Sequence, residues 1–194
     1  MIKYFSLIFV FCLSISVFDT YAKTLIEHFK IEEGVATFTQ EKHFSFLSKP
    51  IKSSGLFKVY KNNILWQVNS PVLSTLLIID NQIWQYSEDA NTTGNHYRKV
   101  IAHASIETLI KTIFTGKINK EQWNTQIKSD QCLVLQPKAS LLAQAINELE
   151  LCLGEQVGSR EILVTDTQKN ITKIYLTHIK RKLSDADVTE FNIH

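Results

Sequence analysis

The residue types that most often perform chemistry are few and scattered in this sequence. His28 and Glu32 have the i, i+4 spacing that places two side chains on one helical face, where they could bind a metal ion. Surface pairs are more common than ligand pairs at this spacing, and we interpret the two residues as a surface pair. His96 and His103 have no nearby partner that would indicate a base or a metal ligand. The histidines therefore predict no active site.

The acidic residues do not form a catalytic set either. Glu148 and Glu150 alternate with Leu149 and Leu151, which is typical of the solvent-facing side of a strand. The chain has no G-x-S-x-G elbow, H-E-x-x-H, P-loop or dinucleotide fingerprint. We predict no catalytic residue, no cofactor and no metal site, which makes an enzyme the weaker class of function.

Charge and composition exclude further classes. The 194 residues include 21 Lys and Arg against 19 Asp and Glu, a net charge of +2, and 44% are hydrophobic. Such a balance is ordinary for a globular domain and argues against nucleic acid as a partner. Lys180-Arg181-Lys182 could meet anionic lipid head groups, but we favour a solvated strand end.

The N-terminal segment has the features of an export signal. Lys3 precedes an uncharged apolar run over residues 5–18, and Thr20-Tyr21-Ala22 provides small residues for signal peptidase. The alternative, a membrane anchor, needs ~20 apolar residues, and the run is shorter. We predict a signal peptide over 1–22, cleaved after Ala22, and a single domain over 23–194.

Cleavage would leave two cysteines, Cys132 and Cys152. Thiols of exported proteins can pair in an oxidising compartment, whereas two unrelated buried thiols are the alternative. We favour the disulfide because both residues lie in predicted neighbouring strands. No histidine clusters with them at the spacing of a metal site.

Alternating apolar residues predict a chain built mainly of strands. Lys61-Asn62-Asn63 and Asp80-Asn81-Gln82 have the composition of hairpin turns. The predicted strands cover Val35–Phe46, Ser53–Tyr60, Ile64–Val68, Leu73–Ile79, Ile83–Tyr86, His96–Val100, Trp123–Lys128, Cys132–Gln136, Ile146–Leu153, Arg160–Thr165 and Ile171–Ile179.

Helices are predicted at two places. Lys23–Glu32 has one apolar helical face, and a second helix begins at Ser105 and ends before Gly116. Its apolar positions follow i, i+3, i+4, i+7, i+8 spacing: Ile106, Leu109, Ile110, Ile113 and Phe114. A helical turn could also begin the segment Ser140–Ala145. The fold class is therefore α+β, a meandering antiparallel sheet with helices on one side, which encloses either an apolar pocket or a filled core.

Short motifs recur along the sheet in a definite order. They are Phe38-Thr39-Gln40, Ser54-Gly55-Leu56-Phe57, Leu65-Trp66-Gln67-Val68-Asn69-Ser70-Pro71, the run from Leu76 through Asp80 and Trp84 to Tyr86, Leu133-Val134-Leu135-Gln136-Pro137-Lys138, and Ile171-Thr172-Lys173-Ile174. This series, from about Thr24 to Phe191, resembles the LolA family of periplasmic outer-membrane lipoprotein carriers. The family's pattern runs F-x-Q, S-G-x-F, W-x-x-x-x-P, D-G-x-x-x-W-x-Y, L-x-P-K and a final strand pair.

The resemblance implies an incomplete antiparallel β-barrel closed by helices, with an apolar cavity for acyl chains. Ile64 and Trp66 would line the cavity. The residues of the lid would be Ile106, Leu109, Ile110 and Ile113, and further lining residues would be Phe38, Phe57, Leu76, Ile78 and Trp84. Plain core packing is the alternative for each of them.

Two positions depart from the family pattern. Tyr60-Lys61 stands where many carriers have an Arg-Pro pair, and Asp80-Asn81 replaces the Asp-Gly turn. Lys61 is the nearest cation and a candidate basic contact, but it is not an equivalent of the arginine. The sequence therefore indicates a divergent relative that could carry a different lipidated cargo.

The resemblance also implies partners and a location. We expect a periplasmic, monomeric carrier that takes lipidated protein or lipid cargo from an inner-membrane donor complex to an outer-membrane acceptor. A shuttle or sensor of free lipid or glycolipid is the alternative within the same fold. A lipid-acting enzyme is the third and weakest possibility.

Overall fold

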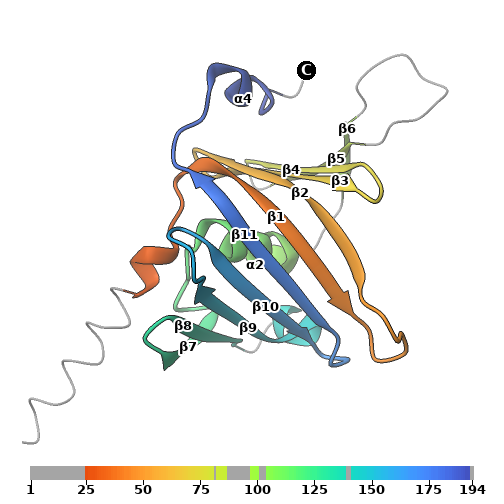
Figure 1. Ribbon diagram of the computed structural model, residues 1–194, viewed down its shortest axis with the longest axis vertical. Coiled ribbons are helices and arrows are strands. Elements are labelled where there is room, and N and C mark those ends of the chain that lie inside the picture. The colour runs from red at the N-terminus through yellow and green to blue at the C-terminus, as the bar shows by residue number, and fades with distance from the viewer. Residues whose placement is uncertain (1–24, 81, 87–96, 101–103, 139–140, 193–194) are drawn as a thin grey trace, which may run out of the picture.

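The computed structural model describes residues 25–80, 82–86, 97–100, 104–138 and 141–192 (Figure 1). The predicted signal peptide lies outside these residues. The strands are β1 (Glu33–His43), β2 (Ile51–Tyr60), β3 (Asn63–Ser70), β4 (Ser74–Ile79), β5 (Gln82–Tyr86), β6 (Tyr97–Val100), β7 (Trp123–Ser129), β8 (Cys132–Pro137), β9 (Ile146–Leu153), β10 (Arg160–Asp166) and β11 (Ile171–Lys180). The helices are α2 (Ala104–Thr115), α3 (Leu141–Ala145) and α4 (Asp185–Thr189), and residues 25–29 are also helical.

The eleven strands form one antiparallel sheet with the order β6-β5-β4-β3-β2-β1-β11-β10-β9-β8-β7. Strands that follow one another along the chain pair, except β6 and β7, and β11 returns to pair with β1. In this order β6 and β7 are the two edges, so the sheet is not closed. The predicted α+β fold, an open antiparallel sheet accompanied by a few helices, is confirmed.

The predicted strand boundary that differs most from the structure is the end of β1. β1 ends at His43 rather than at Phe46, because the chain turns at that point and the amide of Leu47 donates to the Phe44 carbonyl. Phe46 does not continue the apolar strand face and is 77% exposed.

Helix α2 lies on one face of the sheet, behind β1 and β11 in Figure 1. The helix ends at Gly116, which has a φ of +65° and whose amide donates to the Thr112 carbonyl over 3.1 Å. A Cβ atom at Gly116 would lie 2.0 Å from the carbonyl oxygen of Phe29. Glycine therefore allows α2 to stop against the segment that leads into β1.

A C-terminal segment covers part of the other face. Helix α4 begins at Ser184, whose side chain and that of Asp187 form a reciprocal capping box. Leu183 and Phe191, on either side of α4, pack with Leu65 and Leu77 in a second buried cluster.

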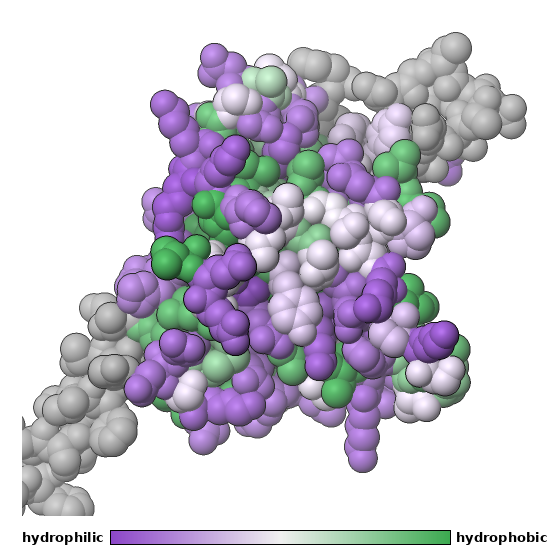
Figure 2. All heavy atoms as spheres, in the orientation of Figure 1, coloured by the Kyte–Doolittle hydropathy of each residue, from purple (hydrophilic) through white to green (hydrophobic). Residues whose placement is uncertain are grey.

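Much of the side seen in Figure 2 is hydrophilic, with hydrophobic residues scattered over it. Within the described residues, no helix combines the length and the hydrophobicity that a membrane span requires.

Candidate functional site

The candidate site is the sheet face that α2 covers. Adjacent strands place apolar residues opposite one another there, with Ala36 paired to Phe57, Phe57 to Trp66 and Trp66 to Leu76. A neighbouring row joins Ile64 to Ile78. Side chains on one face of a sheet recur at every second residue, so both rows point to α2. We call the apolar residues of this face, with those of α2 that contact them, the inner cluster.

Aromatic rings connect the sheet to α2. The ring centroid of Phe114 lies 4.8 Å from that of Phe57 and 5.2 Å from that of Trp66. Phe38 meets Trp66 edge to face at 5.7 Å. Gly55 lies opposite Phe38 in the strand register, and a Cβ there would lie 1.9 Å from the carbonyl oxygen of Gln67 in β3 and 3.0 Å from the Phe38 ring. The glycine of the S-G-x-F motif therefore allows the close approach of the β3 backbone first, and leaves space for the Phe38 ring as well.

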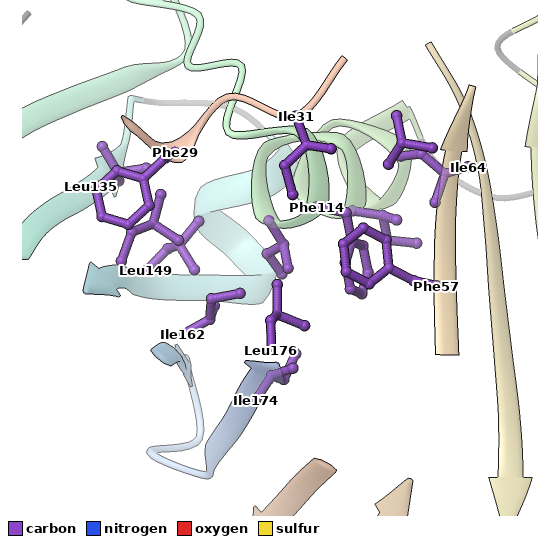
Figure 3. Close-up of a cluster of buried hydrophobic side chains, with 14 of the residues drawn as sticks. Phe29, Ile31, Phe57, Ile64, Phe114, Leu135, Leu149, Ile162, Ile174 and Leu176 are labelled. Carbon is purple, nitrogen blue, oxygen red and sulfur yellow. The ribbon is translucent and has the colours of Figure 1, made fainter. Parts of the chain in front are cut away.

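Hydrophobic side chains of α2 complete the contact. Ile110, Ile113 and Phe114 are buried, and Leu109 is partly buried against the same cluster. Figure 3 shows Phe57 and Phe114 close together beside α2, with Ile31 near the helix. The amide of Ile31 donates to the Thr115 carbonyl over 2.8 Å and ties the end of α2 to the start of β1.

A buried arginine that the sequence did not indicate holds the N-terminal segment in place. Arg160 in β10 is 4% exposed, and its guanidinium donates to the backbone carbonyls of His28 and Phe29. Burial and then the charge of Arg181 lower the pKa of Arg160 from 12.5 to about 10, so it is charged at neutral pH. The carbonyls it binds lie at the C-terminal end of the helical segment 25–29, where a cation is favourable.

Most of the predicted lining and lid residues come together in the inner cluster. Those that are buried there are Phe38, Phe57, Ile64, Ile78, Ile110 and Ile113, and those packed against it are Trp66, Leu76 and Leu109. Ile106 lies in α2, but its side chain is outside the described part of the structure. Six of these nine residues are buried and the other three are partly buried, so α2 and the sheet pack directly against one another in this conformation.

The prediction that Trp84 shares this face is wrong. Trp84 pairs with Leu77, which pairs with Leu65, and these residues belong to the cluster on the opposite face. Its neighbour Ile83 takes the inward position instead. A shift of one residue along a strand moves a side chain to the other face of a sheet, and the sequence motif does not fix that parity.

Lys61 lies in the turn between β2 and β3 and is exposed. Its Nζ atom lies 5.0 Å from the ring centroid of Tyr60, whose side chain packs against the opposite-face cluster. The structure thus places this cation at a sheet end, stacked on an aromatic ring.

Cys132 and Cys152 lie directly opposite one another in β8 and β9, and their sulfur atoms are bonded. The amide of Leu153 donates to the Gln131 carbonyl beside them, so the cysteines occupy a non-hydrogen-bonded pair, where side chains approach most closely. Glu150 lies near both sulfur atoms. Disulfide sulfur is not a thiolate, so this group of three does not provide thiolate ligands for a metal ion.

Comparisons with known proteins place the chain in a family. A LolA superfamily protein from Nitrosomonas europaea is 7% identical and has a TM-score of 0.47, with 86% of this chain and 96% of that chain covered. A DUF1329 family protein from Desulfovibrio piger is 10% identical and has a TM-score of 0.48, with 89% and 95% covered. A search of curated proteins finds no match. The model of the family described as outer membrane lipoprotein carrier protein LolA matches residues 30–193, and the chain therefore belongs to the LolA family.

Proposed function

We propose that the protein carries the acyl chains of lipidated proteins between the inner face of its sheet and α2, in transfer from the inner to the outer membrane. The observation that carries the proposal is the contact of α2 with an unclosed sheet through the rings of Phe57, Trp66 and Phe114. Family membership supports a carrier of lipid or lipoprotein.

The energetics of such a carrier require an exchange. An acyl chain gains ~0.8 kcal/mol for each CH₂ that it buries, so a carrier must offer a large apolar surface. Here that surface is covered by α2, whose own apolar side chains take the place of cargo. Outward movement of α2 would expose the inner cluster, and its return would compete with the cargo and favour release.

One polar group within the inner cluster fits an ester-linked cargo. The indole nitrogen of Trp66 is buried and has no hydrogen-bond acceptor among the described residues. An unpaired buried donor costs free energy, which an ester or amide carbonyl of the cargo would recover by accepting its hydrogen bond. Carriage of this kind requires no bond-making residue, and we infer that the protein acts without catalysis.

The remaining parts of the proposal concern its surroundings. A 22-residue signal peptide would deliver the protein to the periplasm as a monomer, with an inner-membrane complex as donor and an outer-membrane receptor as acceptor. Mass spectrometry of lipid and protein retained by the natively purified protein tests the cargo. Acylated peptides would support the proposal, whereas free lipid or glycolipid alone would favour the alternative shuttle.

Binding of an uncharged fluorescent acyl probe tests whether the inner cluster and α2 bind acyl chains. We expect the exported wild-type protein to enhance probe fluorescence, and Ile110→Asp, which places a charge in the inner cluster, to weaken probe binding about tenfold or more. Val157→Asp is the matched control, since Val157 is fully exposed in the turn after β9. Circular dichroism checks that both variants retain the sheet. Absence of probe binding by the folded wild-type protein would contradict the proposal.

A further inference from the structure

Three turns of the chain meet at one end of the sheet. His43 at the end of β1 pairs with Ile171 at the start of β11, so the β1–β2 loop and the β10–β11 turn are neighbours. Ser54 in β2 pairs with Ser70 at the end of β3, which places the β3–β4 turn at the same end. Figure 1 shows the β1–β2 loop and the β10–β11 turn side by side at the lower right. We call this part of the molecule the hairpin end.

Exposed hydrophobic side chains concentrate at the hairpin end. Seven large hydrophobic residues are exposed in the described part of the chain, and five of them lie in or beside the β1–β2 loop and the β3–β4 turn: Phe46, Leu47, Ile51, Val72 and Leu73. Of the other two, Leu141 begins α3, and Val157 lies at the opposite end, in the turn between β9 and β10. Single exposed hydrophobic residues are ordinary, whereas a group of them indicates a contact surface.

Hydrogen bonds hold the β1–β2 loop in a defined shape. The amide of Ser45 donates to the side-chain oxygen of Asn170 over 3.4 Å, and Asn170 is buried in the β10–β11 turn. The amide of Leu47 donates to the Phe44 carbonyl over 3.1 Å. The ring centroid of Phe46 lies 5.2 Å from that of Phe44, so Phe46 packs on a ring of its own loop. The loop therefore presents Phe46 and Leu47 to the outside.

Lysines flank these apolar residues. Lys49 and Lys52 are exposed, and Lys42 is partly exposed. The segment 41–52 contains these three lysines and a single acidic residue, Glu41. Glu41 is paired with Lys52 at 2.7 Å, which leaves the segment with an excess of positive charge. The hairpin end thus combines exposed apolar groups with cations, which complements an anionic lipid surface.

We propose that the hairpin end docks the protein on the surface of an anionic lipid bilayer. Phe46 and Leu47 enter the boundary between head groups and acyl chains, where aromatic and aliphatic side chains are favourable. Lys49 and Lys52 extend to the lipid phosphates. A bilayer fits this surface because the apolar residues stand on two separate turns rather than on one continuous face. Docking involves no residue of the inner cluster and does not depend on the carrier function.

Flotation with lipid vesicles tests the apolar part of this surface. We expect the exported wild-type protein to float with vesicles of phosphatidylglycerol and phosphatidylcholine, and Phe46→Ser to weaken the partition about tenfold. Val72→Ser and Val157→Ser are a matched pair, since both valines are exposed and only Val72 lies at the hairpin end. Val72→Ser should weaken the partition about threefold, and Val157→Ser should leave it unchanged.

Substitution of single lysines tests the electrostatic part. Lys49→Gln should weaken the partition about fivefold, and added salt should weaken it through screening. Lys182→Gln is the control, because Lys182 is exposed just beyond the end of β11 and lies away from the hairpin end. Vesicles of phosphatidylcholine alone should bind the wild-type protein more weakly than the mixed vesicles do.

Binding of the uncharged acyl probe separates docking from carriage. Phe46→Ser leaves the inner cluster intact and should bind the probe as the wild-type protein does, so either proposal can fail without the other. The docking proposal is overturned if the folded wild-type protein does not float with the mixed vesicles. Equal losses in Lys49→Gln and Lys182→Gln, or in the two valine variants, would overturn it as well. Self-association that Phe46→Ser abolishes, without vesicle binding, would assign this surface to a second copy of the chain instead.

Discussion

The ring of Phe114, in the last turn of α2, packs 4.8 Å from the ring of Phe57 in β2, centroid to centroid. The two residues are far apart in sequence, and both are fully buried. Their contact joins the helix to the sheet at the inner cluster. Any movement of α2 that admits cargo must separate these rings, which makes them a direct probe of the proposed exchange.

Truncation of Phe114 should strongly destabilise the closed conformation. Replacing a buried phenylalanine by alanine removes its burial energy and leaves a cavity, so we expect Phe114→Ala to lower the free energy of unfolding by about 3–5 kcal/mol. Phe46→Ala, at an exposed ring, should change it by less than about 0.5 kcal/mol. Urea denaturation measures both. A loss below about 1 kcal/mol for Phe114→Ala would show that α2 does not pack stably against β2.

Arg160 should stabilise the segment that precedes β1. Arg160→Met removes the charged donor and leaves the carbonyls of His28 and Phe29 without it, which should cost about 2–4 kcal/mol of unfolding free energy. Hydrogen exchange at the Ile31 amide should accelerate, because that amide bonds the end of α2. Lys49→Met, at an exposed cation outside this segment, is the control. An equal effect at both positions would mean that the buried hydrogen bonds of Arg160 are unimportant.

Acid should loosen the C-terminal segment from the sheet. Lys58 in β2 is 5% exposed, and its Nζ atom lies 2.5 Å from Asp187 and 2.6 Å from Glu190. Hydrogen bonds from Lys58 and then Ser184 hold the pKa of Asp187 well below its ordinary value of 3.8. Burial lowers the pKa of Lys58, but its two acidic partners outweigh that effect and raise it.

The sign of the pH effect follows from the lowered pKa of Asp187. A carboxylate with a lowered folded-state pKa stabilises the protein fully above its unfolded-state pKa and loses that effect as the pH falls through the folded-state value. Asp187→Asn should therefore cost about 1–3 kcal/mol at pH 7, and the difference from wild type should shrink below about pH 4. Asp185→Asn, on the same helix, controls for helix-end charge. Urea unfolding as a function of pH measures the difference, and one that stays constant into acid would contradict the ion pair.

The disulfide between Cys132 and Cys152 should stabilise the β8–β9 pair. Cys132 and Cys152 are 20 residues apart, and closing a loop of that size stabilises a protein by ~3 kcal/mol. We expect Cys132→Ser/Cys152→Ser to lose about that amount in urea unfolding. Peptide mapping without reductant should recover the two cysteines in one linked pair. Recovery of two alkylated thiols would show instead that they are free.

The sequence predicted the sheet well because apolar alternation and hairpin turns are local signals. The helix with Ile110 and Ile113 on one face was predicted for the same reason, and both are buried as that pattern requires. The sequence predicted less well which face of the sheet each side chain points to. The apolar neighbours Ile83 and Trp84 pair across the β4–β5 hairpin with Ile78 and Leu77, so both faces of this hairpin are apolar. Packing against distant parts of the chain decides that Ile83 belongs to the inner cluster and Trp84 to the cluster on the opposite face.

Two features escaped prediction for different reasons. Helix α4 is short, but Ser184 with Asp187 three residues later is a capping signal. Leu183, just before the cap, and Val188, within the helix, occupy the two positions of a hydrophobic staple. Those residues could have revealed it. The role of Arg160 could not be predicted from its neighbours in the sequence, because the carbonyls that it binds lie more than 130 residues earlier in the chain. Only the folded topology brings them together.

A covalent cross-link at the end of α2 tests whether the helix must move before an acyl chain can bind. Lys117, just beyond α2, donates to Asn62 in the β2–β3 turn, so cysteines at these two positions can be joined by a short bismaleimide. If α2 must move to admit an acyl chain, the cross-linked Asn62→Cys/Lys117→Cys protein should bind the uncharged probe at least about tenfold more weakly, although its inner cluster is unchanged. The same variant blocked with a monofunctional maleimide carries equivalent modifications without the tether and should bind normally. Full probe binding by the cross-linked protein would contradict the exchange between α2 and cargo, and would place the acyl-binding surface elsewhere.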